Sequence, residues 1–105
     1  MATYVDDAWT ALGDPSRRQI LRRLAERPCS VTEIAEELPI SRPAVSQHLR
    51  VLKEARLVLV RPQGTRRIYE VDLQGLATLR EELDQFWGKA LENFKRLVEE
   101  ETEQP

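Results

Sequence analysis

The chain has 105 residues, of which 41% are hydrophobic and 32% are charged, so it is predicted to form one compact domain with an ionic surface. Its first ten residues, MATYVDDAWT, are acidic and poor in apolar side chains, and no apolar run reaches membrane-spanning length. These features argue against a signal peptide and a membrane partner, and they favour the cytoplasm. The single cysteine, Cys29, cannot form an internal disulfide, which agrees with a reducing compartment.

The net charge of −2 hides an uneven distribution of charge along the chain. Residues 41–71 carry seven basic and two acidic side chains, which gives this segment a charge of +5. Residues 72–105 carry four basic and nine acidic side chains, which gives −5. A basic segment flanked by acidic ones is typical of a protein that binds phosphate groups with one face only.

Local signals predict two helices in the first quarter of the chain. Apolar residues at helical spacing indicate a first helix over residues 4–12. Asp14 is a suitable N-cap for the second helix, and Pro15 fits its first position, where the missing N–H costs nothing. This helix is predicted to reach about Arg27 and to end before Pro28.

The next two predicted helices are short and close together. Ser30 and Glu33 have the spacing of a capping box and open a third helix, which ends before Pro39. Ser41 caps a fourth helix that runs to about Ala55. The residues of this helix that face the core are Val45, Leu49 and Leu52. Two short helices joined by a turn of three or four residues predict a helix-turn-helix.

A β-hairpin and a long helix complete the predicted elements. Residues 57–61 and 67–71 favour strands, and Gly64 lies in the loop between them. The last helix is predicted from about Gln74 to about Glu100. It carries two adjacent apolar stripes: Leu76, Leu79, Leu83, Phe86 and Ala90, and then Trp87, Leu91, Phe94 and Val98. Because a terminal helix of a small domain has one neighbouring surface to cover, the second stripe predicts a partner.

The exposed face of the fourth helix has side chains suited to reading DNA. Together with the N-cap, the candidate residues are Ser41, Arg42, Pro43, Ser46, Gln47, Arg50 and Lys53. Arg bonds guanine edges, Gln bonds adenine edges, and Ser bonds either a base or a phosphate. An ordinary solvated helix face mixes acids and bases. No acid occurs before Glu54, so this face favours DNA binding.

The hairpin loop adds further basic residues, namely Thr65, Arg66 and Arg67 beside the flexible Gly64. Basic loops of this kind reach phosphates or a narrow minor groove. Charges on an edge strand can also serve only to prevent aggregation, and the loop alone does not decide between these roles. The helix-turn-helix that precedes the loop favours contact with DNA.

Three stretches resemble the arsenic-repressor (ArsR) type of winged helix-turn-helix regulator. They are LGDPSRR at 12–18 followed by Ile20 and Leu21, SRPAVSQHLRVL at 41–52, and GTRRIY at 64–69. The similarity spans about residues 5–98. It implies a mainly α fold in which residues 41–55 are the recognition helix and residues 57–71 form a small β-hairpin wing.

The resemblance also implies a homodimer joined through its first and last helices, residues 1–12 and 74–100, within one domain over residues 1–105. The expected interface residues are Val5, Ala8, Trp9, Leu83, Phe86, Trp87, Ala90, Leu91 and Phe94. The implied function is repression of transcription from a palindromic operator in double-stranded DNA. Some signal would release or modulate this repression, and the sequence does not identify a small-molecule inducer.

The chain departs from the metal-sensing members of this family. Those members place Cys-x-Cys at the start of the third helix, where this chain has Ser30 and Thr32, which are poor ligands for soft metals. Others place Asp and His ligands along the last helix, which here has no histidine. The only histidine, His48, is expected to pack beside the core, and Cys29 is expected to be inert rather than an oxidation sensor. We therefore expect neither a metal site nor a cofactor, as in the metal-free branch.

A second departure from the family lies at Arg56, where members usually have glycine after Glu-Ala. Arg56 is therefore expected to have a left-handed or otherwise non-helical backbone, and a left-handed one would cost a non-glycine about 1 kcal/mol.

Two other classes of function fit the sequence less well. A protein-interaction module built on the acidic last helix would not need an acid-free face on the fourth helix. An enzyme would need a nucleophile with a base, paired carboxylates, a metal cluster or a glycine-rich phosphate loop, and the sequence shows none of these.

Overall fold

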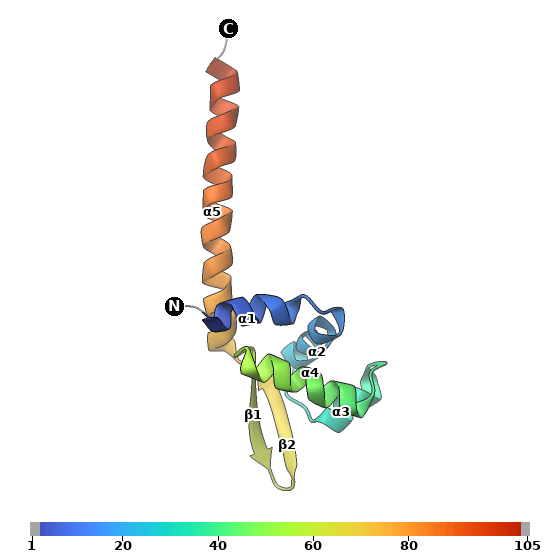
Figure 1. The fold of residues 1–105 in the computed structure, drawn as a ribbon. Coiled ribbons are helices and arrows are strands. Elements are labelled where there is room, and N and C mark those ends of the chain that lie inside the picture. The colour runs from blue at the N-terminus through green and yellow to red at the C-terminus, as the bar shows by residue number, and fades with distance from the viewer. Residues whose placement is uncertain (1–2, 104–105) are drawn as a thin grey trace.

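The computed structural model describes residues 3–103 and contains five helices and one two-stranded sheet within that range (Figure 1). The elements are α1 (Thr3–Leu12), α2 (Pro15–Glu26), α3 (Val31–Glu37), α4 (Arg42–Glu54), β1 (Val58–Gln63), β2 (Arg66–Val71) and α5 (Leu73–Glu103). The predicted order of elements is confirmed, and most boundaries agree within two residues. The expected dimerisation helix 1–12 includes residues 1–2, which lie outside the described range. No helix between residues 3 and 103 is long and apolar enough to cross a membrane.

Side-chain caps start α2 and α3 where the sequence predicts them. The Asp14 carboxylate accepts hydrogen bonds from the backbone N–H groups of Ser16 at 2.8 Å and Arg17 at 3.2 Å. The N–H of Arg17 makes the largest contribution to holding the pKa of the Asp14 carboxyl below its usual value. Ser30 and Glu33 form the predicted capping box at the start of α3.

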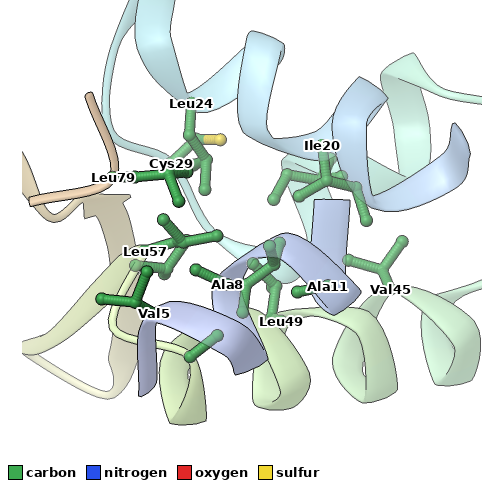
Figure 2. Packing of buried hydrophobic residues seen from close by; sticks show 14 residues of the cluster. Val5, Ala8, Ala11, Ile20, Leu24, Cys29, Val45, Leu49, Leu57 and Leu79 are labelled. Carbon is green, nitrogen blue, oxygen red and sulfur yellow. The ribbon is translucent and has the colours of Figure 1, made fainter. Parts of the chain in front are cut away.

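The core lies where α1, α2 and α4 meet the base of the hairpin, and Figure 2 shows it at close range. Its fully buried side chains include Ile20, Ile34, Val45, Leu49, Leu52, Leu57 and Val58. Val5 and Ala8 of α1 also belong to this core, since each is only 3% exposed. Their assignment to a dimer interface is therefore corrected: α1 buries them within one protomer, and they offer no surface to a second copy.

The hairpin is antiparallel, with a register that runs from the Val58–Val71 pair to the Gln63–Arg66 pair. The other edge of β2 pairs with the loop before α3. There the N–H of Tyr69 donates to the Cys29 carbonyl at 2.8 Å, and the N–H of Cys29 donates to the Tyr69 carbonyl at 3.1 Å. This pairing fixes the base of the hairpin against the start of α3.

The turn between α4 and β1 confirms the expectation for Arg56, which has a left-handed φ of 62°. The Arg56 guanidinium carbon lies 4.5 Å from the centre of the Tyr4 ring in α1. The first turn of α5 packs directly against the Arg56 backbone, and a Cβ atom at Gly75 would lie 1.6 Å from the Arg56 carbonyl oxygen. Glycine is thus needed at position 75 for this close approach.

Helix α5 leaves the body of the protein and extends alone (Figure 1). Leu79 is buried against the core and Leu76 is half-buried, whereas every residue from Leu83 to Thr102 is exposed. The two predicted stripes therefore do not divide into one inward and one outward face. The division instead follows the length of the helix, because the body of the domain contacts only its first part.

Candidate nucleic-acid interface

Helix α4 presents the predicted residues on one exposed surface. Its N-cap, Ser41, accepts a hydrogen bond from the N–H of Ala44 at 3.3 Å, which leaves Arg42 in the first turn. Val45, Leu49 and Leu52 face the core and are completely buried, so the opposite side of the helix faces solvent. We call this side the outward face of α4, and it consists of Arg42, Pro43, Ser46, Gln47, Arg50 and Lys53.

The side chains of the outward face are largely free to bind another molecule. Within residues 3–103, Arg42, Gln47 and Lys53 form no side-chain hydrogen bond or ion pair. Arg50 lies 3.8 Å from Glu54, and both side chains are exposed. An exposed pair at this spacing contributes only about 0.3–0.5 kcal/mol, so Arg50 can change partner easily.

A groove joins this face to the hairpin. It has a volume of about 410 Å³ and lies between α4, the start of α3 and the turn of the hairpin. Its lining consists of Ser30, Val31, Thr32, Arg42, Ser46, Thr65, Arg66, Arg67 and Tyr69. The structure thus brings together two sets of candidates that the sequence identified separately. It also adds the hydroxyl of Thr32, a residue that the sequence singled out only as a poor metal ligand.

The two adjacent arginines of the hairpin have different environments, which the sequence did not distinguish. Nη2 of Arg66 donates to Oε1 of Glu33 at 2.6 Å and to Oγ of Ser30 at 3.0 Å. Arg67 is exposed and has no ion pair in the part of the chain that the structure describes. The pKa of Glu33 is lowered, first by the N–H of Ser30 and further by Ser30 Oγ and Arg66.

Arg23 is a buried residue of α2 that connects this helix to α3, and the sequence pattern does not indicate this role. Its guanidinium, in a residue only 6% exposed, donates to the Glu37 carboxylate and to the carbonyl oxygen of Arg27 at 3.1 Å. The hydrogen bond from Arg23 keeps the pKa of Glu37 below its usual range. This contact connects α2 to the last residue of α3.

His48 and Cys29 lie inside the domain rather than at an open site. His48 is half-buried on α4, and Nη1 of Arg17 lies 3.5 Å from its Nδ1, so its expected position beside the core is confirmed. Cys29 is 1% exposed, and burial raises the pKa of its thiol. Among residues 3–103, no three His, Cys, Asp or Glu side chains form a group that could hold a metal ion.

Comparison with known proteins places this architecture in a family. Residues 14–59 match the family model described as bacterial regulatory protein, arsR family. The chain is 56% identical over 103 residues to the HTH-type transcriptional regulator Rv2034 of Mycobacterium tuberculosis, with 96% of each chain covered. That relative is named as a transcriptional regulator, a non-enzymatic class, which confirms that the chain is not an enzyme.

Solved structures agree in fold. An ArsR-like transcriptional regulator from Rhodococcus sp. RHA1 superimposes with a TM-score of 0.77 and 27% identity, covering 90% of this chain and 92% of that one. A homodimeric winged helix-turn-helix DNA-binding domain from Mycobacterium bovis gives a TM-score of 0.67 and 29% identity over 82% of this chain and 80% of that one. The chain therefore belongs to the ArsR family and is a transcriptional regulator with a DNA-binding winged helix-turn-helix, in which β1 and β2 form the wing.

Proposed function

We propose that the protein is a sequence-specific repressor that binds a palindromic operator in double-stranded DNA as a homodimer. The observation that carries this proposal is the outward face of α4, which has no acid before Glu54 and leaves Arg42 and Gln47 unpaired within the described residues. These side chains have the donors and acceptors that read base edges in the major groove. Bound at a promoter, such a protein would block transcription by occupying the site.

In the proposed complex, α4 enters the major groove with its N-terminal part leading. Arg42, Ser46, Gln47 and Arg50 would share the base contacts and the nearest phosphate contacts. Ser41 and the first N–H groups of α4 would help to hold a phosphate, since the helix dipole favours an anion there. The groove between α4 and the wing would then face the DNA backbone, with Thr65 and Arg67 at its edge.

The exposed part of α5 supports the homodimer. This part of the helix has several exposed apolar side chains, namely Leu83, Phe86, Trp87, Ala90, Leu91 and Phe94. A continuous apolar surface of this kind marks an interaction site. The homodimeric structural neighbour supports a second copy as the partner. In a symmetric dimer, each α5 would pack against its own copy across the two-fold axis.

Trp9 remains in the proposed interface, unlike Val5 and Ala8. It is 37% exposed, and its indole Nε1 donates to Oε1 of Glu82 on α5 at 2.7 Å. The indole therefore lies at the junction of α1 and α5, next to the exposed part of α5.

Half-site centres about 34 Å or somewhat further apart would match two recognition helices on one face of B-DNA.

We further propose that this repression does not depend on metal sensing, because Ser30 and Thr32 are poor soft-metal ligands and the Ser30 hydroxyl already contacts Glu33 and Arg66. Since the proposed target is double-stranded DNA and the matching family model describes bacterial regulatory proteins, we place the protein in the cytoplasm.

The experiment is a comparison of DNA binding by variants of α4 and of the wing across a series of salt concentrations. A duplex selected from a random pool by the wild-type protein serves as the specific probe, and a shuffled duplex serves as the non-specific one. Gln47→Ala or Arg42→Ala should cost about 1–3 kcal/mol per subunit and relax the preference at one base position per half-site. Arg67→Ala should weaken both duplexes alike and reduce the salt dependence by about one unit for each phosphate that the variant no longer neutralises.

Arg22→Ala is the matched control, because Arg22 is exposed on α2 and lines a different hollow, beside α1 and α5. It should leave both affinities unchanged. If Gln47 and Arg42 variants keep the sequence preference of the wild type, α4 does not read the bases. If Gln47→Ala, Arg42→Ala and Arg67→Ala all leave DNA binding unchanged, a protein partner on the acidic α5 becomes the better explanation.

A further inference from the structure

The wing is attached to the helix-turn-helix at two levels. At its base, the backbones of Tyr69 and Cys29 form the pair of hydrogen bonds described above. At the first residue of β2, the Arg66 guanidinium reaches Glu33 and Ser30. Cys29 and Ser30 are adjacent, so both attachments end on the short segment that starts α3. The wing and the helix-turn-helix are therefore connected along one edge.

The carboxylate that holds Arg66 is itself held in place. Oε1 of Glu33 accepts hydrogen bonds from the Ser30 N–H at 3.3 Å and from Ser30 Oγ at 3.2 Å, and Ser30 is only 6% exposed. A capping box orders this side chain independently of the wing. Arg66 thus meets a carboxylate that has already lost its rotamer freedom, which removes part of the entropy cost that makes most surface ion pairs weak.

We propose that Arg66 is a positioning residue of the wing rather than a DNA contact. It holds the start of β2 against α3 and so sets where the adjacent Arg67 lies relative to the outward face of α4. The inference rests on the proposed function, since it assigns to Arg67 the contact with the DNA backbone. It also replaces the expectation that both arginines contact DNA with a division of roles between them.

The competing role for Arg66 is to leave Glu33 and bind a phosphate when DNA arrives. The two roles predict opposite effects of Glu33→Gln. Under the positioning role, this variant weakens DNA binding even though it removes a negative charge near the DNA. Under the phosphate role, it frees the guanidinium and strengthens binding. Glutamine also serves at this position of a capping box, so the start of α3 is preserved.

The test measures the affinity of Glu33→Gln, Arg66→Ala and the double variant for the selected duplex at several salt concentrations. We expect each single variant to weaken binding by about 2- to 10-fold for the dimer, as removal of an ordered ion pair from each subunit would. The double variant should bind the selected duplex about as tightly as either single variant, because both substitutions remove the same ion pair. The salt dependence should stay unchanged for Arg66→Ala, because the loosened wing can still bring Arg67 to its phosphate and the loss of affinity is the cost of ordering the wing. In Arg67→Ala the salt dependence should fall by about 0.9 for each phosphate that is no longer neutralised.

Glu36→Gln is the matched control for the loss of charge. Glu36 is exposed on the same helix, and it has no ion pair among the described residues. This variant should bind the duplex as tightly as the wild type or slightly more tightly. If Glu33→Gln also binds more tightly, or if Arg66→Ala lowers the salt dependence as Arg67→Ala does, Arg66 contacts the DNA and the positioning role is wrong.

A second measurement needs no DNA. Amide hydrogen exchange in the wing should become faster in Glu33→Gln and in Arg66→Ala, and should be unchanged in Arg67→Ala, because only the first two break the attachment. Unchanged exchange in all three variants would show that the Arg66–Glu33 ion pair does not hold the wing. If the wild-type protein selects no duplex, the proposed function fails, and hydrogen exchange still tests the attachment.

Discussion

Replacing Gly75 with alanine should destabilise the protein, although alanine is the better helix former. A Cβ atom at this position would lie 1.6 Å from the Arg56 carbonyl oxygen and 2.8 Å from the carbonyl carbon. These are backbone atoms, and the turn that carries them is held by hydrogen bonds from Arg56 N–H to Lys53 at 3.0 Å and from Leu57 N–H to Leu52 at 2.9 Å. The turn therefore cannot move aside as a flexible side chain would.

The size of the effect follows from this geometry. Ordinary contact begins at 3.4 Å, so α5 and the turn after α4 would have to separate by nearly 2 Å. Forcing extra atoms into a packed contact costs about 1–3 kcal/mol. The separation would also loosen Leu79, which is 6% exposed where α5 meets the core. Because the clash is with backbone atoms, the upper part of this range, about 2–3 kcal/mol, applies. Alanine would return at most about 1 kcal/mol of helix propensity, so the net loss of unfolding free energy should be about 1–2 kcal/mol.

Urea unfolding followed by circular dichroism would measure this loss, at a fixed protein concentration because the proposed dimer makes stability depend on concentration. Ala77→Gly is the control, since Ala77 is exposed two residues further along the same helix. It should cost about 0.5–1 kcal/mol and thereby calibrate helix propensity in α5. If Gly75→Ala is as stable as the wild type or more stable, α5 does not begin against the Arg56 carbonyl and the reasoning fails.

Three further predictions concern the turn, the partner and the signal. Arg56→Gly should remove the strain of the left-handed backbone, about 1 kcal/mol, but it also loses the stacking on Tyr4, worth about 0.5–1 kcal/mol. The unfolding free energy should therefore stay equal or rise slightly, and a clear decrease would reveal other structural contacts of Arg56. Analytical ultracentrifugation at micromolar concentration should show a homodimer that Trp87→Glu dissociates, and a wild-type monomer would contradict the proposed interface. Stoichiometric arsenite, zinc or cadmium should leave DNA affinity unchanged, and tight binding of one metal per subunit that releases DNA would refute this expectation.

The sequence alone determined the order of the elements and the face of α4 that is exposed. The physical reason is that these features depend on nearby residues. Asp14 and Ser30 cap helices through side chains that reach only two or three residues along the chain. The apolar spacing of Val45, Leu49 and Leu52 sets the rotation of α4 about its axis. Once these three residues face the core, the helical repeat fixes the direction of all the remaining side chains of the helix. The resemblance to the ArsR family added the expectation of an unusual backbone at Arg56.

The tertiary structure decided which of the candidate residues are available to a partner. Val5 and Trp9 share a helical stripe in the sequence, yet the contacts of α1 bury the first and leave the second partly exposed. Likewise, the apolar stripes of α5 do not show how far the body of the domain extends along the helix. Burial depends on the packing of elements that are distant in the chain, and local periodicity does not contain that information.

The same distinction separates the two arginines of the wing. Arg66 and Arg67 are chemically identical neighbours, and the partner that distinguishes them, Glu33, lies 33 residues before Arg66 in the sequence. The pairing of β2 with the segment at Cys29 brings this carboxylate within hydrogen-bond distance of the Arg66 guanidinium, whereas Arg67 has no ion pair among the described residues. Ion pairs form between groups that the fold places together, so residue type indicated a basic wing and the fold decided which of its charges is engaged.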